Sequence, residues 1–228
     1  MRWLYNFIGR LYLMPLINAE IRKRFKANGR TTEYSYALSK IDQFATGKVL
    51  DIGSGKSSWP HLLSYSCGLD VTAIDRVIGY WSDYFNRHYK IVNDDITNSK
   101  LTDFFQFITC ISTLEHIKDH NSAMVEINEL LDLGGYLVLT FPYNEQIYFK
   151  NIYEHKDAGY GKDKKFVTQV YSRSQIDYWL HLTQLKIVDQ VYYKVFTGEF
   201  WTFGDPIKPI QVEKNELHHL TCILMQKL

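Results

Sequence analysis

From Lys48 to Pro142 the sequence alternates short apolar runs with stretches of helical character, and this alternation restricts the possible folds more than any other feature. The runs KVLDI, DVTAID, YKIV, FFQFITCIS and YLVLTF are each expected to form a buried strand. Helices are expected through WPHLLSYS and over HNSAMVEINELLDL, with Gly134 and Gly135 ending the second. Such alternation favours an α/β fold with a mostly parallel sheet and helices on both faces.

The segments on either side of this alternation have a different character. Residues 1–27 are amphipathic and helical in pattern, and a second helix is expected over Glu33–Phe44. We therefore predict an N-terminal helical extension over 1–46 and a main domain over 47–228. Residues 143–172 are polar, aromatic and irregular, as expected of a functional insertion. A helix over SRSQIDYWLHL and two final strands, LKIVDQVYYKVF and HHLTCILMQKL, follow it, and the loop between these strands carries Trp201 and two prolines.

The loop VLDIGSGKSSW contains the beginnings of two different nucleotide-binding motifs. A P-loop needs a glycine five residues before Gly55, where this chain has Leu50, and it would enclose Asp51 beside the phosphates. The alternative motif has an acid at the end of the first strand and glycines two and four residues later. Asp51, Gly53 and Gly55 fit this second motif, since the glycines allow the backbone to turn tightly and approach a ligand. An acid at this position attracts an ammonium group and repels a pyrophosphate. This pattern predicts a cofactor such as S-adenosylmethionine, unless Asp51 only caps the turn.

Two further acids follow the next two strands. Asp75 ends the second strand, 24 residues after Asp51, where an acid can accept both ribose hydroxyls. Asp95 and Ile96 follow the third strand, where a carboxylate can accept from an adenine amine and an apolar side chain can cover the ring. Asp75 as a plain surface acid and Asp94 in place of Asp95 are the alternatives. The three acids predict a ligand across the carboxyl ends of the strands.

The sequence resembles the class I S-adenosylmethionine-dependent methyltransferases, in particular their small-molecule O-methyltransferase subgroup. The segments VLDIGSG, VTAIDR, NDDI, CISTLEHI and LLDLGGYLVLTFP carry the resemblance, in family order from Lys48 to Pro142. It implies a Rossmann-like seven-stranded sheet with a final antiparallel strand. The usual third glycine of the loop is Ser57 here, which is small enough to preserve binding. The resemblance implies cofactor binding by Asp51, Gly53, Ser54, Gly55, Asp75, Arg76, Asp95, Ile96 and Ser112.

The segment STLEHIKDH places Glu115 and His116 just after the fourth strand, where the family holds the transferable methyl group. Histidine titrates near neutral pH, so His116 is a candidate base, with a metal ligand or a structural histidine as alternatives. His155, in the aromatic loop, is the third candidate catalytic residue, and it could meet Glu115 and His116 at a divalent ion. Terminal 2′-O-methyltransferases of small RNAs resemble this arrangement, but they carry a glutamate where this chain has Ser112. Metal dependence is therefore the less favoured interpretation.

Aromatic side chains in 143–203 are expected to form the acceptor side and to stack on a sugar or an aromatic ring. We expect O-methylation of a small molecule, a glycan or a lipid-linked acceptor. A protein or RNA methyltransferase and a non-catalytic cofactor-binding partner are the alternatives.

The net charge of +1 does not suggest a nucleic-acid partner. Met1–Arg30 holds seven Lys or Arg and one Glu, so 1–27 could lie on an anionic membrane surface, cap the pocket or form a homodimer contact. No signal peptide is expected, which predicts a cytoplasmic location with peripheral membrane contact as an option.

Overall fold

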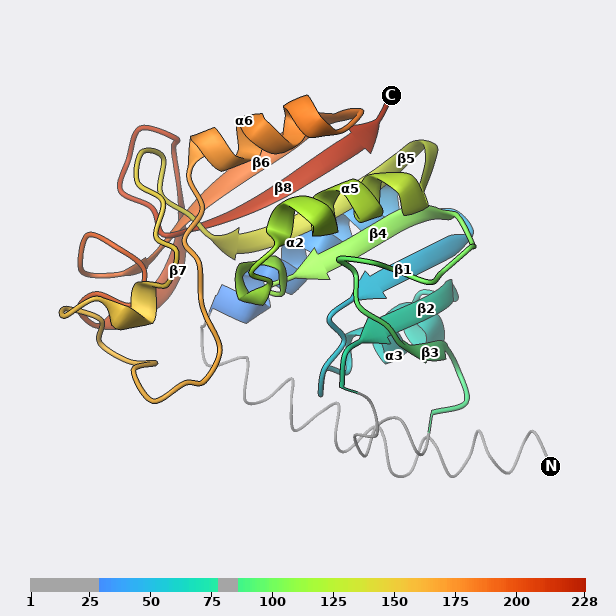
Figure 1. Cartoon of the computed structure of the whole chain (residues 1–228), viewed down its shortest axis with the longest axis horizontal. Helices are drawn as coiled ribbons and strands as arrows, with labels where there is room; N and C mark the ends of the chain where they lie inside the picture. Colours follow the sequence, from blue (N-terminus) through green and yellow to red (C-terminus); the bar gives the residue numbers. More distant parts are fainter. Residues whose placement is uncertain (1–28, 78–85) are drawn as a thin grey trace.

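The computed structural model describes residues 29–77 and 86–228, and its centre is one eight-stranded sheet (Figure 1). The strand order is β3-β2-β1-β4-β5-β8-β6-β7. The strands are β1 (Lys48–Ile52), β2 (Asp70–Asp75), β3 (Lys90–Asn93), β4 (Phe105–Ile111), β5 (Leu131–Pro142), β6 (Leu185–Phe196), β7 (Pro206–Val212) and β8 (Leu220–Lys227). The helix predicted over 1–27 lies outside the described residues.

Helices cover both faces of the sheet, as predicted (Figure 1). The helices are α2 (Gly29–Phe44), α3 (Trp59–His61) with a π-helical continuation (Leu62–Ser66), α5 (His120–Leu130) and α6 (Arg173–Leu182), and two short 3-10 turns span Leu114–His116 and Ile152–Glu154. Among the described residues, no helix has the length and apolar character needed to span a membrane.

The direction of the strands brings the predicted ligand-binding residues to one edge. β1 pairs in parallel with β2 and β4, β2 with β3, and β4 with β5, so the carboxyl ends of these five strands meet. β8 is antiparallel to β5 and to β6. The strand order reverses between β1 and β4, which is the place where open α/β sheets bind their ligands.

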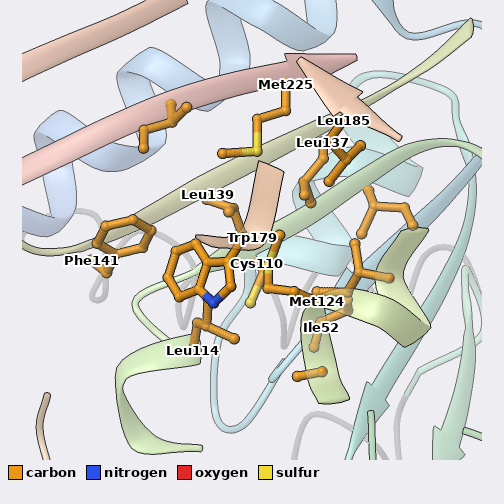
Figure 2. Close-up of a cluster of buried hydrophobic side chains, with 14 of the residues drawn as sticks. Ile52, Cys110, Leu114, Met124, Leu137, Leu139, Phe141, Trp179, Leu185 and Met225 are labelled. Carbon is orange, nitrogen blue, oxygen red and sulfur yellow. The ribbon is translucent and has the colours of Figure 1, made fainter. Parts of the chain in front are cut away.

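The core consists of two apolar layers, one on each face of the sheet. In β1, Leu50 faces the layer that contains α5 and α6, while Val49 faces the layer that contains α2 and α3. Because both faces of the central strands β1, β4 and β8 are buried, these strands are mostly apolar rather than alternating. Figure 2 shows the indole of Trp179, from α6, among Cys110 and Leu114 in the first layer.

The prediction of seven strands is wrong by one, because β7 forms in the connection that was expected to be a loop between the two final strands. Pro206 and Pro209 lie within β7 and argue against a central strand, since proline cannot donate to a ladder. β7 lies at the sheet edge and pairs only with β6, so proline is tolerated there.

The helix predicted to continue to the glycine pair ends earlier. α5 stops at Leu130, and Leu131 already pairs with Phe105 of β4. Gly134 and Gly135 therefore lie inside β5. A Cβ at Gly135 would lie 2.9 Å from the carbonyl oxygen of Gln106, so close strand approach explains this glycine.

The proposed division of the chain at residue 46 stays a prediction. α2 packs Tyr36, Ala37 and Ile41 into the same apolar layer as Val49 and Cys222. This helix is thus one of the covering helices of the sheet.

Candidate functional site

The carboxyl edge of the sheet contains two cavities, of about 230 and about 690 Å³, which share Gly53 and Ser112 in their walls. Every cofactor-binding residue predicted from the sequence lines at least one of them. The smaller cavity is lined by Asp51, Gly53, Ser54, Gly55 and Ser112, and the larger by Gly53, Asp75, Arg76, Asp95, Ile96 and Ser112.

Asp51 is a buried carboxyl group at the end of β1. Its Oδ1 accepts a hydrogen bond from Thr109 Oγ1 at 2.8 Å, and Trp59 Nε1 lies 3.3 Å from the same hydroxyl. Burial raises the pKa of Asp51 to about 7, and the hydrogen bond from Thr109 opposes that shift. No hydrogen bond among the described residues makes Asp51 a cap of the following turn. A carboxyl group held this way is stabilised in its charged form by a cation placed in the smaller cavity.

The loop after β1 brings its backbone close to the cavity. Gly53 has φ +78° and Gly55 has φ +50°, a conformation that favours glycine. A Cβ at Gly53 would lie 2.2 Å from Thr113 Cγ2, so no other residue fits without displacing Thr113. Between the two glycines, the buried Ser54 Oγ has no hydrogen-bond partner among the described residues. A buried hydroxyl without a partner is a position that a polar ligand can satisfy.

Helix α2 completes the smaller cavity, which the sequence analysis missed. Arg30 and Tyr34 line it, together with Trp59 from α3. The ring of Tyr34 stacks on Trp59 at 4.6 Å, and its hydroxyl lies 2.6 Å from Ser57 Oγ. The guanidinium of Arg30 donates to the carbonyl of Ile111 at 3.1 Å. No sequence motif identifies these residues, because their role depends on how α2 packs across the sheet.

Asp75 has a defined place in the larger cavity and is not a plain surface acid. Its Oδ2 accepts from the backbone N–H of Gly55 at 2.8 Å, and its Oδ1 accepts from that of Val77 at 2.8 Å. These two bonds fix the carboxylate at the end of β2, beside the glycine loop. Each oxygen keeps a lone pair that can accept from a ligand hydroxyl.

Asp94 and Asp95 both line the larger cavity, but they have different roles. Asp94 is buried, and its carboxylate accepts from Ser99 Oγ at 2.6 Å and from the backbone N–H of Lys100, so it organises the loop. The side chain of Asp95 is 41% exposed and lies 3.4 Å from the Nε of Arg76. Asp95 is the more exposed carboxylate of the pair.

His116 also lines the larger cavity and is the last residue of the 3-10 turn that follows β4. Its Nδ1 lies 2.8 Å from the carbonyl oxygen of Val167. Since a carbonyl only accepts, Nδ1 carries a proton, and in the neutral ring Nε2 has a free lone pair. His116 is therefore suited to accept a proton at Nε2.

Glu115 lies beside His116 but is buried. Its Oε1 is 3.9 Å from His116 Nε2, and its Oε2 has no hydrogen-bond partner among the described residues. Burial raises the pKa of Glu115 to about 7, and the nearby His116 opposes this shift. Glu115 lines neither cavity, so its carboxyl group lies beside His116 and not in the wall of a cavity.

His155 does not join this pair, and the less favoured alternative, in which the three side chains meet at one ion, has no support among the described residues. Its ring packs against Phe149 and Phe203, and its Nδ1 lies 3.7 Å from Asp157. His155 lies apart from Glu115 and His116 because its loop packs on the β6–β7 connection, where Phe203 contacts its ring. Within 29–77 and 86–228, no group of three or more His, Cys, Asp or Glu side chains could hold a metal ion.

The segment predicted to form the acceptor side closes the larger cavity. Lys165, Phe166 and Val167 line it, and the ring of Phe166 lies edge-on to His116 at 4.8 Å. Backbone and side-chain bonds fix the segment on the turn after β4. The N–H of Gln169 donates to the carbonyl of Glu115 at 2.9 Å, and the hydroxyl of Tyr171 donates to that of Leu114 at 2.7 Å. In Figure 1 this segment runs beside the β6–β7 connection, beyond the carboxyl ends of β4 and β5.

Comparisons with known proteins agree with this architecture. A family model described as a methyltransferase domain matches residues 21–190. Among solved structures, an S-adenosylmethionine-dependent methyltransferase from Clostridium acetobutylicum ATCC 824 superposes with a TM-score of 0.59, at 17% identity, over 98% of this chain and 99% of that chain. The N-methyltransferase NodS from Bradyrhizobium japonicum WM9, in complex with S-adenosyl-L-homocysteine, superposes with a TM-score of 0.56, at 15% identity, over 87% and 86%.

The glycopeptide N-methyltransferase MtfA, in complex with S-adenosylmethionine, superposes with a TM-score of 0.57, at 13% identity, over 90% of this chain and 96% of that chain. At these identities the superpositions establish the fold alone. The search of curated proteins found no match.

Proposed function

The chain belongs to the methyltransferase domain family and is an S-adenosylmethionine-dependent methyltransferase, and from this premise we propose that it methylates a hydroxyl group of a small molecule or glycan. One observation carries the proposal. Three acids at successive strand ends line the cavities, and His116, with an available Nε2, also lines the larger one.

The residues of the smaller cavity suit the amino-acid part of the cofactor. Asp51 is a buried carboxyl group that needs a cation to ionise easily, and the cofactor carries an ammonium group. The unpartnered Ser54 Oγ and the guanidinium of Arg30 face the same cavity and can bind its carboxylate. None of these contacts requires a phosphate group on the ligand, and the carboxylate of Asp51 would repel one.

The residues of the larger cavity suit the nucleoside part. Asp75 would accept from the ribose hydroxyls, and Asp95 from the adenine amine, with Ile96 against the ring. When bound, the cofactor supplies a methyl group on a positively charged sulfur, which is already activated for displacement.

The protein then has to position the acceptor and remove its proton. His116 Nε2 accepts the proton of the acceptor hydroxyl as the oxygen attacks. Glu115, 3.9 Å from Nε2, stabilises the imidazolium that results. Phe166 and Val167 close the cavity on the acceptor side, and the carbonyl oxygen of Val167 accepts from Nδ1 of His116.

Oxygen rather than nitrogen as the acceptor atom is favoured by this base. NodS and MtfA are named as N-methyltransferases, and a neutral amine attacks without losing a proton first. A hydroxyl must lose its proton as it attacks and so gains much more from a base placed beside it. A second candidate function is methylation of a protein or RNA, and the net charge of +1 gives no support to a nucleic-acid acceptor.

The experiment uses methyl-labelled S-adenosylmethionine, the purified full chain and a lysate of the source organism, separated afterwards into lipid, glycan and small-molecule, protein and RNA fractions. We expect label in the glycan, small-molecule or lipid fraction, and none with His116→Asn. Label in protein or RNA would contradict the proposed substrate class. Recovery of the label in base-stable methylamine rather than methyl ether would contradict the acceptor atom.

A further inference from the structure

The charged side chains that line the larger cavity differ in whether the protein supplies a hydrogen-bond partner. Each of its four acids already accepts from the protein: Asp75 from the amides of Gly55 and Val77, Asp94 from Ser99 and Lys100, Asp95 from Thr97, and Asp119 from Ser122 as the cap of α5. Lys118 and Lys165 line the same cavity and have no hydrogen bond or ion pair within the described parts of the chain.

These two lysines come from the two segments that hold the candidate base. Lys118 follows the turn that carries His116, and Lys165 precedes Phe166, whose ring lies against His116. They therefore border the place where the acceptor must lie. We propose that Lys118 and Lys165 form an anion subsite, and that the acceptor carries a carboxylate or phosphate group next to the sugar or aromatic ring that contacts Phe166. This inference rests on the proposed function and specifies its substrate class.

Binding can be tested without turnover, so a failure here differs from a failure of the proposed function. Saturation-transfer NMR with S-adenosylhomocysteine present would compare three probes: glucuronate, glucose 6-phosphate and neutral glucose. We expect one or both anions to bind at least about tenfold better than glucose, with the preference reduced by added salt. The two anions distinguish a carboxylate source from a phosphate source.

Lys118→Gln/Lys165→Gln should remove the preference. The matched control is Lys162→Gln, because Lys162 lies on the same segment, donates to the carbonyl of Lys156 and does not line the cavity. Equal binding of all three probes by the unmodified protein would overturn the subsite, and so would a preference that survives in the double variant. Methyl transfer to neutral acceptors would leave the proposed function intact.

A separate observation concerns Ser112, which lies between the two cavities. It has φ +43°, one of two non-glycine residues with positive φ among those described, and this region is unfavourable for serine. Its hydroxyl donates to Glu33 Oε1, a buried carboxylate on α2 that also accepts from Thr140 Oγ1 at 2.6 Å. Its backbone N–H lies 3.0 Å from that same Thr140 hydroxyl.

Glu33 thus connects α2 to Ser112, just after β4, and to Thr140 in β5. Its Oε2 lies 3.8 Å from Arg30, which donates to the carbonyl of the residue before Ser112. We infer that Glu33 is a positioning residue, which holds Ser112 in the left-handed conformation and thereby fixes the wall shared by the two cavities.

Glycine offers a direct test, because it adopts positive φ without a partner. Glu33→Ala should weaken S-adenosylhomocysteine binding about tenfold by calorimetry, well below the melting temperature. In Glu33→Ala/Ser112→Gly the affinity should return to within about threefold of Ser112→Gly alone. Glu33→Gln, which keeps the side-chain shape, serves if the alanine variant does not fold.

A purely structural role would lower the melting temperature and leave the affinity unchanged. Unchanged affinity in Glu33→Ala would therefore overturn the inference. Failure of the glycine substitution to recover affinity in the double variant would overturn it equally.

Discussion

Replacing Asp51 by asparagine should stabilise the cofactor-free protein while destroying its binding site. In the unfolded chain this carboxyl group titrates near 3.8, and in the folded protein burial raises its pKa to about 7. Folding therefore favours the protonated form of Asp51. Its contribution to the free energy of unfolding is fully present below about pH 4 and is lost as the pH rises through 7. At pH 8 the ionised carboxylate lowers the free energy of unfolding by about 4 kcal/mol relative to the protonated group.

Asparagine has no charge to bury but brings an amide that is only partly paired, so a net gain of roughly 2 kcal/mol should remain at pH 8. For a chain of this size, that corresponds to a rise in Tm of about 4–8 °C. The assay is thermal unfolding of the cofactor-free protein from pH 5 to pH 8. The difference in Tm between Asp51→Asn and the unmodified protein should be less than half as large at pH 5 as at pH 8.

Asp177→Asn is the control, because Asp177 is an exposed acid on α6 outside both cavities. It should leave Tm within about 1 °C at all pH values. If Asp51→Asn melts at or below the unmodified protein at pH 8, or if its advantage is independent of pH, the assignment of Asp51 as a buried, costly carboxyl group is refuted.

Three further outcomes are expected. His116→Asn should lower kcat by about 10²–10⁴-fold, while S-adenosylhomocysteine affinity measured by calorimetry stays within about threefold; an unchanged kcat would exclude His116 as the base. Gly53→Ala places a Cβ 2.2 Å from Thr113 and should abolish cofactor binding, whereas Gly47→Ala, with no atom within 4 Å of its Cβ, should cost only about 1 kcal/mol in urea unfolding and leave binding intact. Trp179→Ala removes the fully buried indole seen in Figure 2 and should cost about 3–5 kcal/mol; a loss under 1 kcal/mol would contradict its place in the core.

The sequence was sufficient to predict the parts of the site that local pattern controls. Asp51, Asp75 and Asp95 lie at or just after the ends of short apolar runs that indicate strands, and parallel strands bring their carboxyl ends together. The same reasoning places His116 just beyond β4. All four line the cavities.

Features that depend on tertiary packing were missed. Arg30 and Glu33 enter the site because α2 crosses the end of β4, and a weakly amphipathic helix gives no sign of which residues will do so. His155 was misplaced because aromatic contacts with the β6–β7 connection decide the path of its loop. β7 was missed because Pro206 and Pro209 argue against a strand everywhere except at an edge.

The most direct test of the account is a calorimetric titration of the full chain with S-adenosylhomocysteine, with ATP as the comparison ligand. The account predicts one-to-one binding of S-adenosylhomocysteine and no binding of ATP. It also predicts loss of binding in Asp51→Asn, weakening of at least about tenfold in Asp75→Asn, and no change in Asp177→Asn. Binding that survives both Asp51→Asn and Asp75→Asn, or tighter binding of ATP, would contradict the placement of the cofactor at the carboxyl edge of the sheet.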